Sequence, residues 1–172
     1  MTAVDLRRVA SGQHPHDVAR LAQKWAIRRG FDARTRPLLL EKLSPFIAES
    51  DPTGRHFGPA LGAYARTIRH VREPGDVGEV VLDPWKTAEL RAGDCDDLAA
   101  LIAAFAACVG LPCAIGVYPT GPGSAHVVAL VGDTWNTTSR RLAWQVDNLG
   151  ARPFPSANPS IAERCVRLFR VR

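Results

Sequence analysis

The chain has 172 residues, a hydrophobic fraction of 46% and a formal net charge of +5. These values are typical of a single soluble domain that can bury a core without disulfides or metals. No apolar run has membrane-spanning length, and the first residues lack the apolar segment of a signal peptide. The four cysteines are 13, 5 and 52 residues apart, which matches neither a disulfide framework nor a zinc motif. We therefore expect a cytoplasmic protein with reduced thiols, no cofactor and no membrane contact.

The positive charge is concentrated at the N-terminal end of the chain. Residues 1–36 contain eight basic residues against three acidic ones, which equals the whole formal excess. One interpretation is a basic face for an anionic partner, such as an acidic protein surface. The other, which we favour, is the solvated outer face of an amphipathic helix whose apolar stripe includes Val18, Leu21 and Trp25. Aromatic residues do not alternate with the basic ones, so nucleic acid is not the expected partner.

The first half of the chain predicts helices. Residues 16–29 form the first, which ends at Gly30, and residues 37–48 form the second, with a proline in its first turn. A third helix is expected over residues 60–71, and Pro74 and the following glycine stop it. We expect residues 1–55 to be a helical extension of one domain, with a catalytic-type core over residues 56–172.

The most informative run, RAGDCDDLAAL, places Cys95 in the first turn of a further helix. Asp94 is a natural N-cap, and the helix ends at the Gly-Leu-Pro that starts at Gly110. The apolar residues recur at helical spacing: Leu98, Leu101, Ile102, Phe105 and Val109. Backbone N–H groups at a helix start stabilise a thiolate, which is the reactive form of cysteine. Asp94, Asp96 and Asp97 oppose this effect, because nearby negative charge raises a thiol pKa.

Short apolar segments with turn-rich linkers follow the helix. Residues 113–118 (CAIGVY) form the first strand, and His126 opens the second (HVVALV). The third covers residues 142–146 and ends at Asp147. The tail over residues 161–172 fits either a strand or a helical stripe, and we favour a strand that closes the sheet. Helices that precede strands predict an α+β fold, with a helical N-terminal half packed on a small antiparallel sheet.

Cys95, His126 and Asp147 occur in the order of a thiol catalytic triad. In such a triad the histidine takes the thiol proton, and the aspartate orients the imidazole. Taken alone, His126 fits a hydrogen-bonded histidine at a strand edge, and Asp147 fits a turn residue. A metal site from Cys95, Asp96, Asp97 and His126 is not favoured, because no ligands show the close paired spacing of zinc sites.

The segment from residue 60 to residue 149 resembles the transglutaminase-like cysteine enzymes of the papain-type fold, in particular their small bacterial and phage members. The motifs are GDCDDLAALIAAFAACVGLPCAIGV, HVVALV and WQVDN. The resemblance implies that Cys95 is the nucleophile, His126 the general base and acid, and Asp147 the orienting group. Val128 stands where many relatives have an aromatic residue. For the oxyanion donor or an auxiliary role, Trp85 and Asp94 are weak candidates.

We therefore expect thiol-dependent acyl transfer on peptide-type amides, by an amidase, protease or transamidase that acts on a peptide or protein. The alternative is a non-enzymatic assembly protein of a phage particle that is built on the same domain and associated with the virion. A protein partner could then bind through the basic N-terminal segment.

Overall fold

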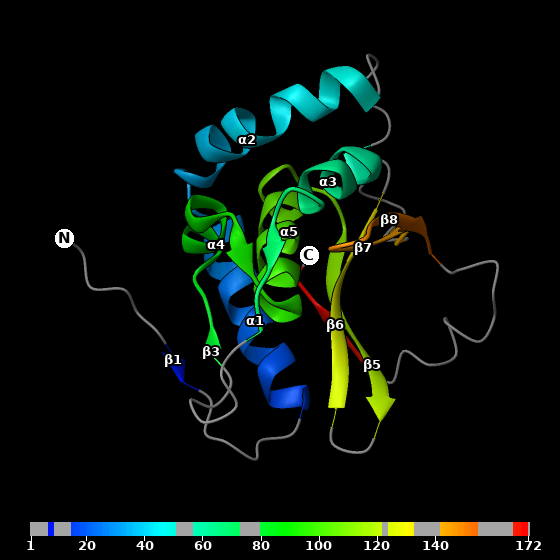
Figure 1. The fold of residues 1–172 in the computed structure, drawn as a ribbon. Helices are drawn as coiled ribbons and strands as arrows, with labels where there is room; N and C mark the ends of the chain where they lie inside the picture. Colours follow the sequence, from blue (N-terminus) through cyan, green and yellow to red (C-terminus); the bar gives the residue numbers. More distant parts are fainter. Residues whose placement is uncertain are drawn as a thin grey trace.

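The computed structural model describes residues 7–8, 15–50, 57–72, 80–121, 124–132, 142–154 and 167–171. Figure 1 shows the helices gathered beside a twisted sheet, with α5 in the centre. Within these ranges the helices are α1 (Pro15–Gly30), α2 (Thr35–Ser50), α3 (Phe57–Ala65), α4 (Pro84–Leu90) and α5 (Cys95–Cys108). None of the described helices is long and apolar enough to cross a membrane.

The main sheet of the described chain has five antiparallel strands in the order β8-β7-β6-β5-β9. Its strands are β5 (Cys113–Gly121), β6 (Ser124–Val131), β7 (Trp144–Asp147), β8 (Gly150–Pro153) and β9 (Arg167–Arg170). Two small ribbons accompany it. In one, β1 (Arg7–Arg8) pairs with β3 (Val80–Val81); in the other, β2 (Arg69–His70) pairs in parallel with β4 (Ala92–Gly93).

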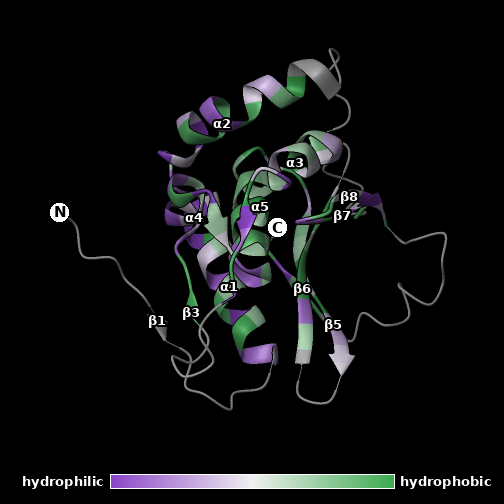
Figure 2. Cartoon of the chain, in the orientation of Figure 1, coloured by the Kyte–Doolittle hydropathy of each residue, from purple (hydrophilic) through white to green (hydrophobic). Residues whose placement is uncertain are grey.

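Helix α5 is the core of the molecule. Its residues from Asp96 to Ala107 are all buried, and it packs against α1 on one side and against β5 and β6 on another. Figure 2 shows the hydrophobic colouring concentrated on α5 and the adjoining strands. A helix that is apolar around its whole circumference is stable in water only when other elements cover every side. The alanines of α5 leave little side-chain bulk, so its neighbours come close.

One such close approach is at the end of α1. A Cβ atom on Gly30 would lie 2.5 Å from the Cβ of Ala107 and 3.3 Å from the carbonyl oxygen of Ala104. The glycine that ends α1 is thus required by packing.

The α+β class and the helical N-terminal half packed on an antiparallel sheet are confirmed. The first and central helices have the expected bounds, and β9 confirms the strand expected in the tail. The third helix was predicted wrongly: it ends at Ala65, because Arg69 and His70 pair with β4 instead of extending the helix. Further elements were missed, among them α4, the strand β8 and the short strands β1, β3 and β4.

The described cysteines of the central helix and the first long strand differ in burial. Cys113 is fully buried, and its Sγ lies 3.5 Å from the carbonyl oxygen of Ala103, whereas Cys108 is only partly buried. Cys165 and the break at Pro74 lie outside the described residues.

Gly30→Ala should destabilise the protein by about 1–3 kcal/mol, because the added methyl group overlaps a tightly packed helix. In Gly30→Ala/Ala107→Gly the opposing methyl group is absent, so the double variant should be more stable than additivity of the two single changes predicts. Urea unfolding of the four proteins measures this coupling. Strict additivity would show that the two residues do not pack against each other.

Candidate active site

A capping box fixes the start of α5. The Asp94 side chain accepts hydrogen bonds from the backbone N–H groups of Asp96 (3.2 Å) and Asp97 (3.4 Å). In return, the Asp97 carboxylate accepts one from the N–H of Asp94 at 3.2 Å. Cys95 is the first residue of the helix and is partly buried. The predicted position of the thiol in the first helical turn is thus confirmed, and a cap of this kind stabilises a helix by about 1 kcal/mol.

Asp97 also ties the helix start to the chain before α4. Its second carboxylate oxygen accepts a hydrogen bond from the N–H of Leu82 at 2.6 Å. A Cβ atom on Gly93 would lie 2.8 Å from both the Cβ and the Oδ2 of Asp97. The glycine of the Gly-Asp-Cys run is therefore explained by the space that the capping carboxylate needs.

Asp96 is a buried carboxyl group beside the thiol. Neither of its oxygens accepts a hydrogen bond from the described residues. Its pKa is raised well above the ordinary value, first because burial disfavours the charged form and then because of the hydrogen bond to Asp94 and the negative charges of Asp94 and Asp97. A protonated Asp96 that donates to Asp94 satisfies this geometry.

The same three aspartates form an oxygen cluster. Asp94, Asp96 and Asp97 each place one carboxylate oxygen within 4.8 Å of the other two. Oxygen ligands of this kind suit a hard divalent cation such as Ca²⁺. The cluster differs from the metal site considered from the sequence, because it contains neither Cys95 nor His126.

His126 and Asp147 lie together on neighbouring strands. The Nε2 atom of His126 is 3.6 Å from Oδ2 of Asp147, and the Asp147 side chain is only 2% exposed. Leu149 donates its backbone N–H to Oδ1 of Asp147 at 2.9 Å. Gln145 donates its side-chain N–H to Oδ2 at 3.4 Å, and Arg152 forms an ion pair with the same oxygen. The carboxylate that sequence reasoning assigned to His126 is thus held by several donors at once.

The donors around Asp147 determine its charge. Burial alone would raise the pKa of the carboxyl group, but the hydrogen bonds from His126 and Leu149, the charge of Arg152 and the Gln145 amide outweigh it. The pKa of Asp147 is therefore held below its ordinary value, and the group is ionised at neutral pH. An ionised carboxylate beside an imidazole favours the imidazolium form and fixes the ring orientation.

Strand alternation assigns the two side chains to one face of the sheet. His126 is paired with Tyr118, a residue of the smaller apolar cluster that also includes Val128 and Leu130. Asp147 follows Val146, which belongs to the larger cluster against which Cys95 packs. The structure thus brings His126 and Asp147 together on the face of the smaller cluster, whereas Cys95 packs against the larger cluster on the opposite face, where α5 lies. The approach of the thiol to the imidazole is part of the proposal below.

Trp85 has a different environment from that of an oxyanion donor. Its indole N–H is donated to the hydroxyl of Thr35 at 2.9 Å. Its ring lies under two guanidinium groups, with 3.8 Å from Arg29 and 4.5 Å from Arg34 to the centroid. An indole has a single N–H donor, and that of Trp85 is already used by Thr35. In this structure Trp85 therefore links α4 to the junction of α1 and α2. Asp94, the other auxiliary candidate, is the cap of α5.

Arg152 and Gln145 are the members of the site that the sequence did not reveal. They face each other across β7 and β8, and Gln145 is two residues before Asp147 on the same strand face. The alternation Gln145-Val146-Asp147 could have indicated the glutamine. Arg152 gave no signal, because the sequence predicted no strand over the residues that contain it.

The comparisons with known proteins leave the family open. No protein-family model matches the chain, and no curated protein sequence matches it. Among solved structures, LapG of Legionella pneumophila aligns over 90% of this chain and 95% of its own length. The identity is 13% and the TM-score is 0.39. A likeness at that TM-score carries no argument about fold or function, so the transglutaminase-like assignment belongs to the proposal that follows.

Asp147 should make the stability of the protein depend on pH. A carboxyl group whose pKa is lower in the folded protein stabilises the fold above its unfolded pKa of about 3.9. This contribution disappears as the pH falls through the lower folded value. Asp147→Asn should therefore be less stable than wild type near neutral pH, and the difference should shrink below about pH 4. Urea unfolding between about pH 3 and 7 measures the difference.

Arg152→Gln is the matched variant for this measurement. It leaves the carboxylate in place and removes one of the interactions that lower its pKa. When Arg152→Gln is present, the stability difference caused by Asp147→Asn should therefore shrink at a higher pH than it does with Arg152. An Asp147→Asn difference that stays constant over the whole pH range would contradict the role of the ion pair and hydrogen bonds.

Proposed function

We propose that the protein catalyses thiol-dependent acyl transfer on a peptide-type amide, with Cys95 as nucleophile, His126 as general base and acid, and Asp147 as orienting group. The observation that carries the proposal is the His126–Asp147 contact of 3.6 Å, in which the carboxylate is buried and held ionised. The capped helix start with Cys95 in its first turn supports it. So does the resemblance of the three motifs to transglutaminase-like cysteine enzymes.

The proposed reaction proceeds through a thioester. His126 accepts the proton of the Cys95 thiol, and the sulfur attacks the carbonyl carbon of the amide. When the C–N bond breaks, the imidazolium returns the proton to the leaving amine. Water or a second amine then attacks the thioester and regenerates the thiol, which gives hydrolysis or transamidation. Asp147 stabilises the imidazolium while it exists and does not take the proton itself.

The mechanism requires that the negative charge of the acidic residues next to Cys95 be offset. Two of them, Asp94 and Asp97, accept backbone hydrogen bonds at the helix start, and Asp96 is neutral when protonated. The negative charge that opposes a thiolate is thus smaller than three ionised aspartates would give. An imidazolium close to Sγ is still needed to lower the thiol pKa to the range of catalytic cysteines.

Iodoacetamide alkylation tests the proposal without knowledge of the substrate. Cys95 should react at least about tenfold faster than the other cysteines at pH 7. Pairing with an imidazolium gives its thiol a larger ionised fraction than an ordinary thiol has. His126→Gln should remove most of this advantage, and Asp147→Asn should reduce it. Mass spectrometry of peptides after timed labelling gives the rate at each cysteine.

Partly buried Cys108 is the internal control for accessibility, because its pKa is raised by burial and it has no histidine assigned to it. Circular dichroism must show that the variants are folded. Equal labelling of Cys95 in the wild type and in His126→Gln would overturn the triad.

A non-enzymatic role on the same fold is the second candidate. The observation that favours it is the acidic first turn, where the carboxylates of Asp94, Asp96 and Asp97 cluster at the end of α5 that begins with Cys95. A slowly reacting Cys95 in a well-folded protein would support this structural or assembly role, including the phage-particle role expected from the sequence.

A further inference from the structure

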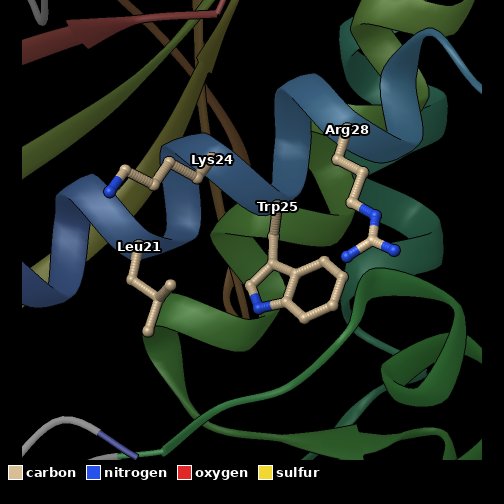
Figure 3. Close-up of a pocket in the computed structure, with 4 residues that line it drawn as sticks. All are labelled: Leu21, Lys24, Trp25 and Arg28. Carbon is tan, nitrogen blue, oxygen red and sulfur yellow. The ribbon is translucent and has the colours of Figure 1, made fainter. Parts of the chain in front are cut away.

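A small notch lies on the outer side of α1, away from the candidate active site. It has a volume of about 60 Å³ and is lined by Leu21, Lys24, Trp25 and Arg28. Figure 3 shows Leu21, Trp25 and Arg28 projecting from the same side of α1, whereas the Lys24 side chain extends along the helix, away from the Trp25 ring. Their spacing of three and four residues places them on adjacent turns of one helix side. The notch has room for a carboxylate-sized group.

Every polar group that lines the notch is a hydrogen-bond donor. Lys24 and Arg28 are cationic and exposed, and Arg28 lies 5.2 Å from the ring centroid of Trp25. Trp25 is only 3% exposed, and its indole N–H finds no acceptor among the described residues. In Figure 3 the indole nitrogen is on the side of the ring that faces Leu21. A buried N–H without an acceptor is unfavourable, so an oxygen from a ligand would improve the site.

The surface around the notch is positive and partly apolar. Arg20 lies one turn before Lys24 and is exposed, and Asp17 is the only acidic residue of α1. Ile27, one turn after Lys24, is 39% exposed, and Phe31, just after the end of α1, is 61% exposed. Exposed apolar side chains beside a basic stripe are typical of a surface that binds an acidic, partly apolar chain.

We propose that this face of α1 binds an acidic peptide segment of a protein partner. One glutamate or aspartate carboxylate of the segment enters the notch, where the Lys24 and Arg28 side chains turn toward it and a shift of the Trp25 ring exposes its buried N–H as a third donor. An apolar residue of the same segment covers Ile27 and Phe31. A nucleic acid fits less well, because the buried Trp25 ring cannot stack with a base.

The Trp25 indole resonance in a ¹H–¹⁵N spectrum of the full chain is the direct readout. Trp25→Phe identifies the signal among those of the four tryptophans. The probe is the acetylated peptide Glu-Glu-Leu-Leu-Glu-Glu, and its control is Gln-Gln-Leu-Leu-Gln-Gln. The acidic peptide should shift the Trp25 signal saturably toward lower field, as expected when an N–H gains an acceptor. The neutral peptide should not, and added salt should weaken binding.

Two variants test the named donors. Lys24→Gln and Arg28→Gln should each weaken binding of the acidic peptide about tenfold, since each removes a charged hydrogen-bond donor. Lys86→Gln is the matched control, because Lys86 lies on α4, pairs with Glu89 and does not line the notch. Its affinity should equal that of the wild type.

Three outcomes would overturn the proposal. The Trp25 signal could stay in place, all three lysine and arginine variants could weaken binding equally, or inorganic phosphate could shift the signal with higher affinity than the peptide does. The last result would reassign the notch to a phosphate group. None of these measurements depends on catalysis, so a failure of the acyl-transfer proposal leaves them unaffected.

Discussion

The burial of α5 is the constraint on which the rest of the structure depends. The helix is apolar on every side, so α1, the sheet and the shorter helices must all cover it. Close packing at Gly30 and the capping box at Asp94 fix the two ends of this arrangement. Because the helix cannot rotate or slide without opening its core, the position of Cys95 relative to the sheet is set by packing that involves no catalytic residue. A site on such an element is pre-organised, because the packing that positions it stabilises the fold independently of the site.

Charge at the candidate site is controlled by burial and hydrogen bonding more than by the number of acidic residues. Four aspartates belong to the site, yet they have different states. Asp94 and Asp97 are acceptors at a helix start, where negative charge is favourable. Asp96 is buried with a raised pKa, and Asp147 is ionised beside His126 and Arg152. In the proposed mechanism Arg152 is unfavourable, because it shares the carboxylate with the imidazole and leaves Asp147 less able to stabilise an imidazolium.

Local patterns predicted those parts of the fold whose signals are themselves local. The periodicity of α5 and the Asp94 cap specify a helix and its start by neighbouring residues alone. The places of β5, β6 and β7 along the chain followed from short apolar runs. Interactions across long sequence separations were missed. Arg29 binds Asp83 and lies over Trp85, and Arg152 binds Asp147 from the next strand. The third helix was predicted too long for the same reason, since its final residues gain more from pairing with β4 than from helical periodicity.

The basic N-terminal segment shows how one composition can have two physical explanations. Arg29 and Arg34 form ion pairs with Asp32, and Arg29 also binds Asp83, so part of the positive charge holds the junction of α1 and α2. Arg20, Lys24 and Arg28 lie on the outer side of α1 instead. For this second group, a solvated helix face would explain exposed cations equally well. It would not explain why Trp25 buries its N–H beside them with no acceptor among the described residues, because burial of a donor is unfavourable unless an acceptor arrives. That mismatch separates a binding face from an ordinary basic surface.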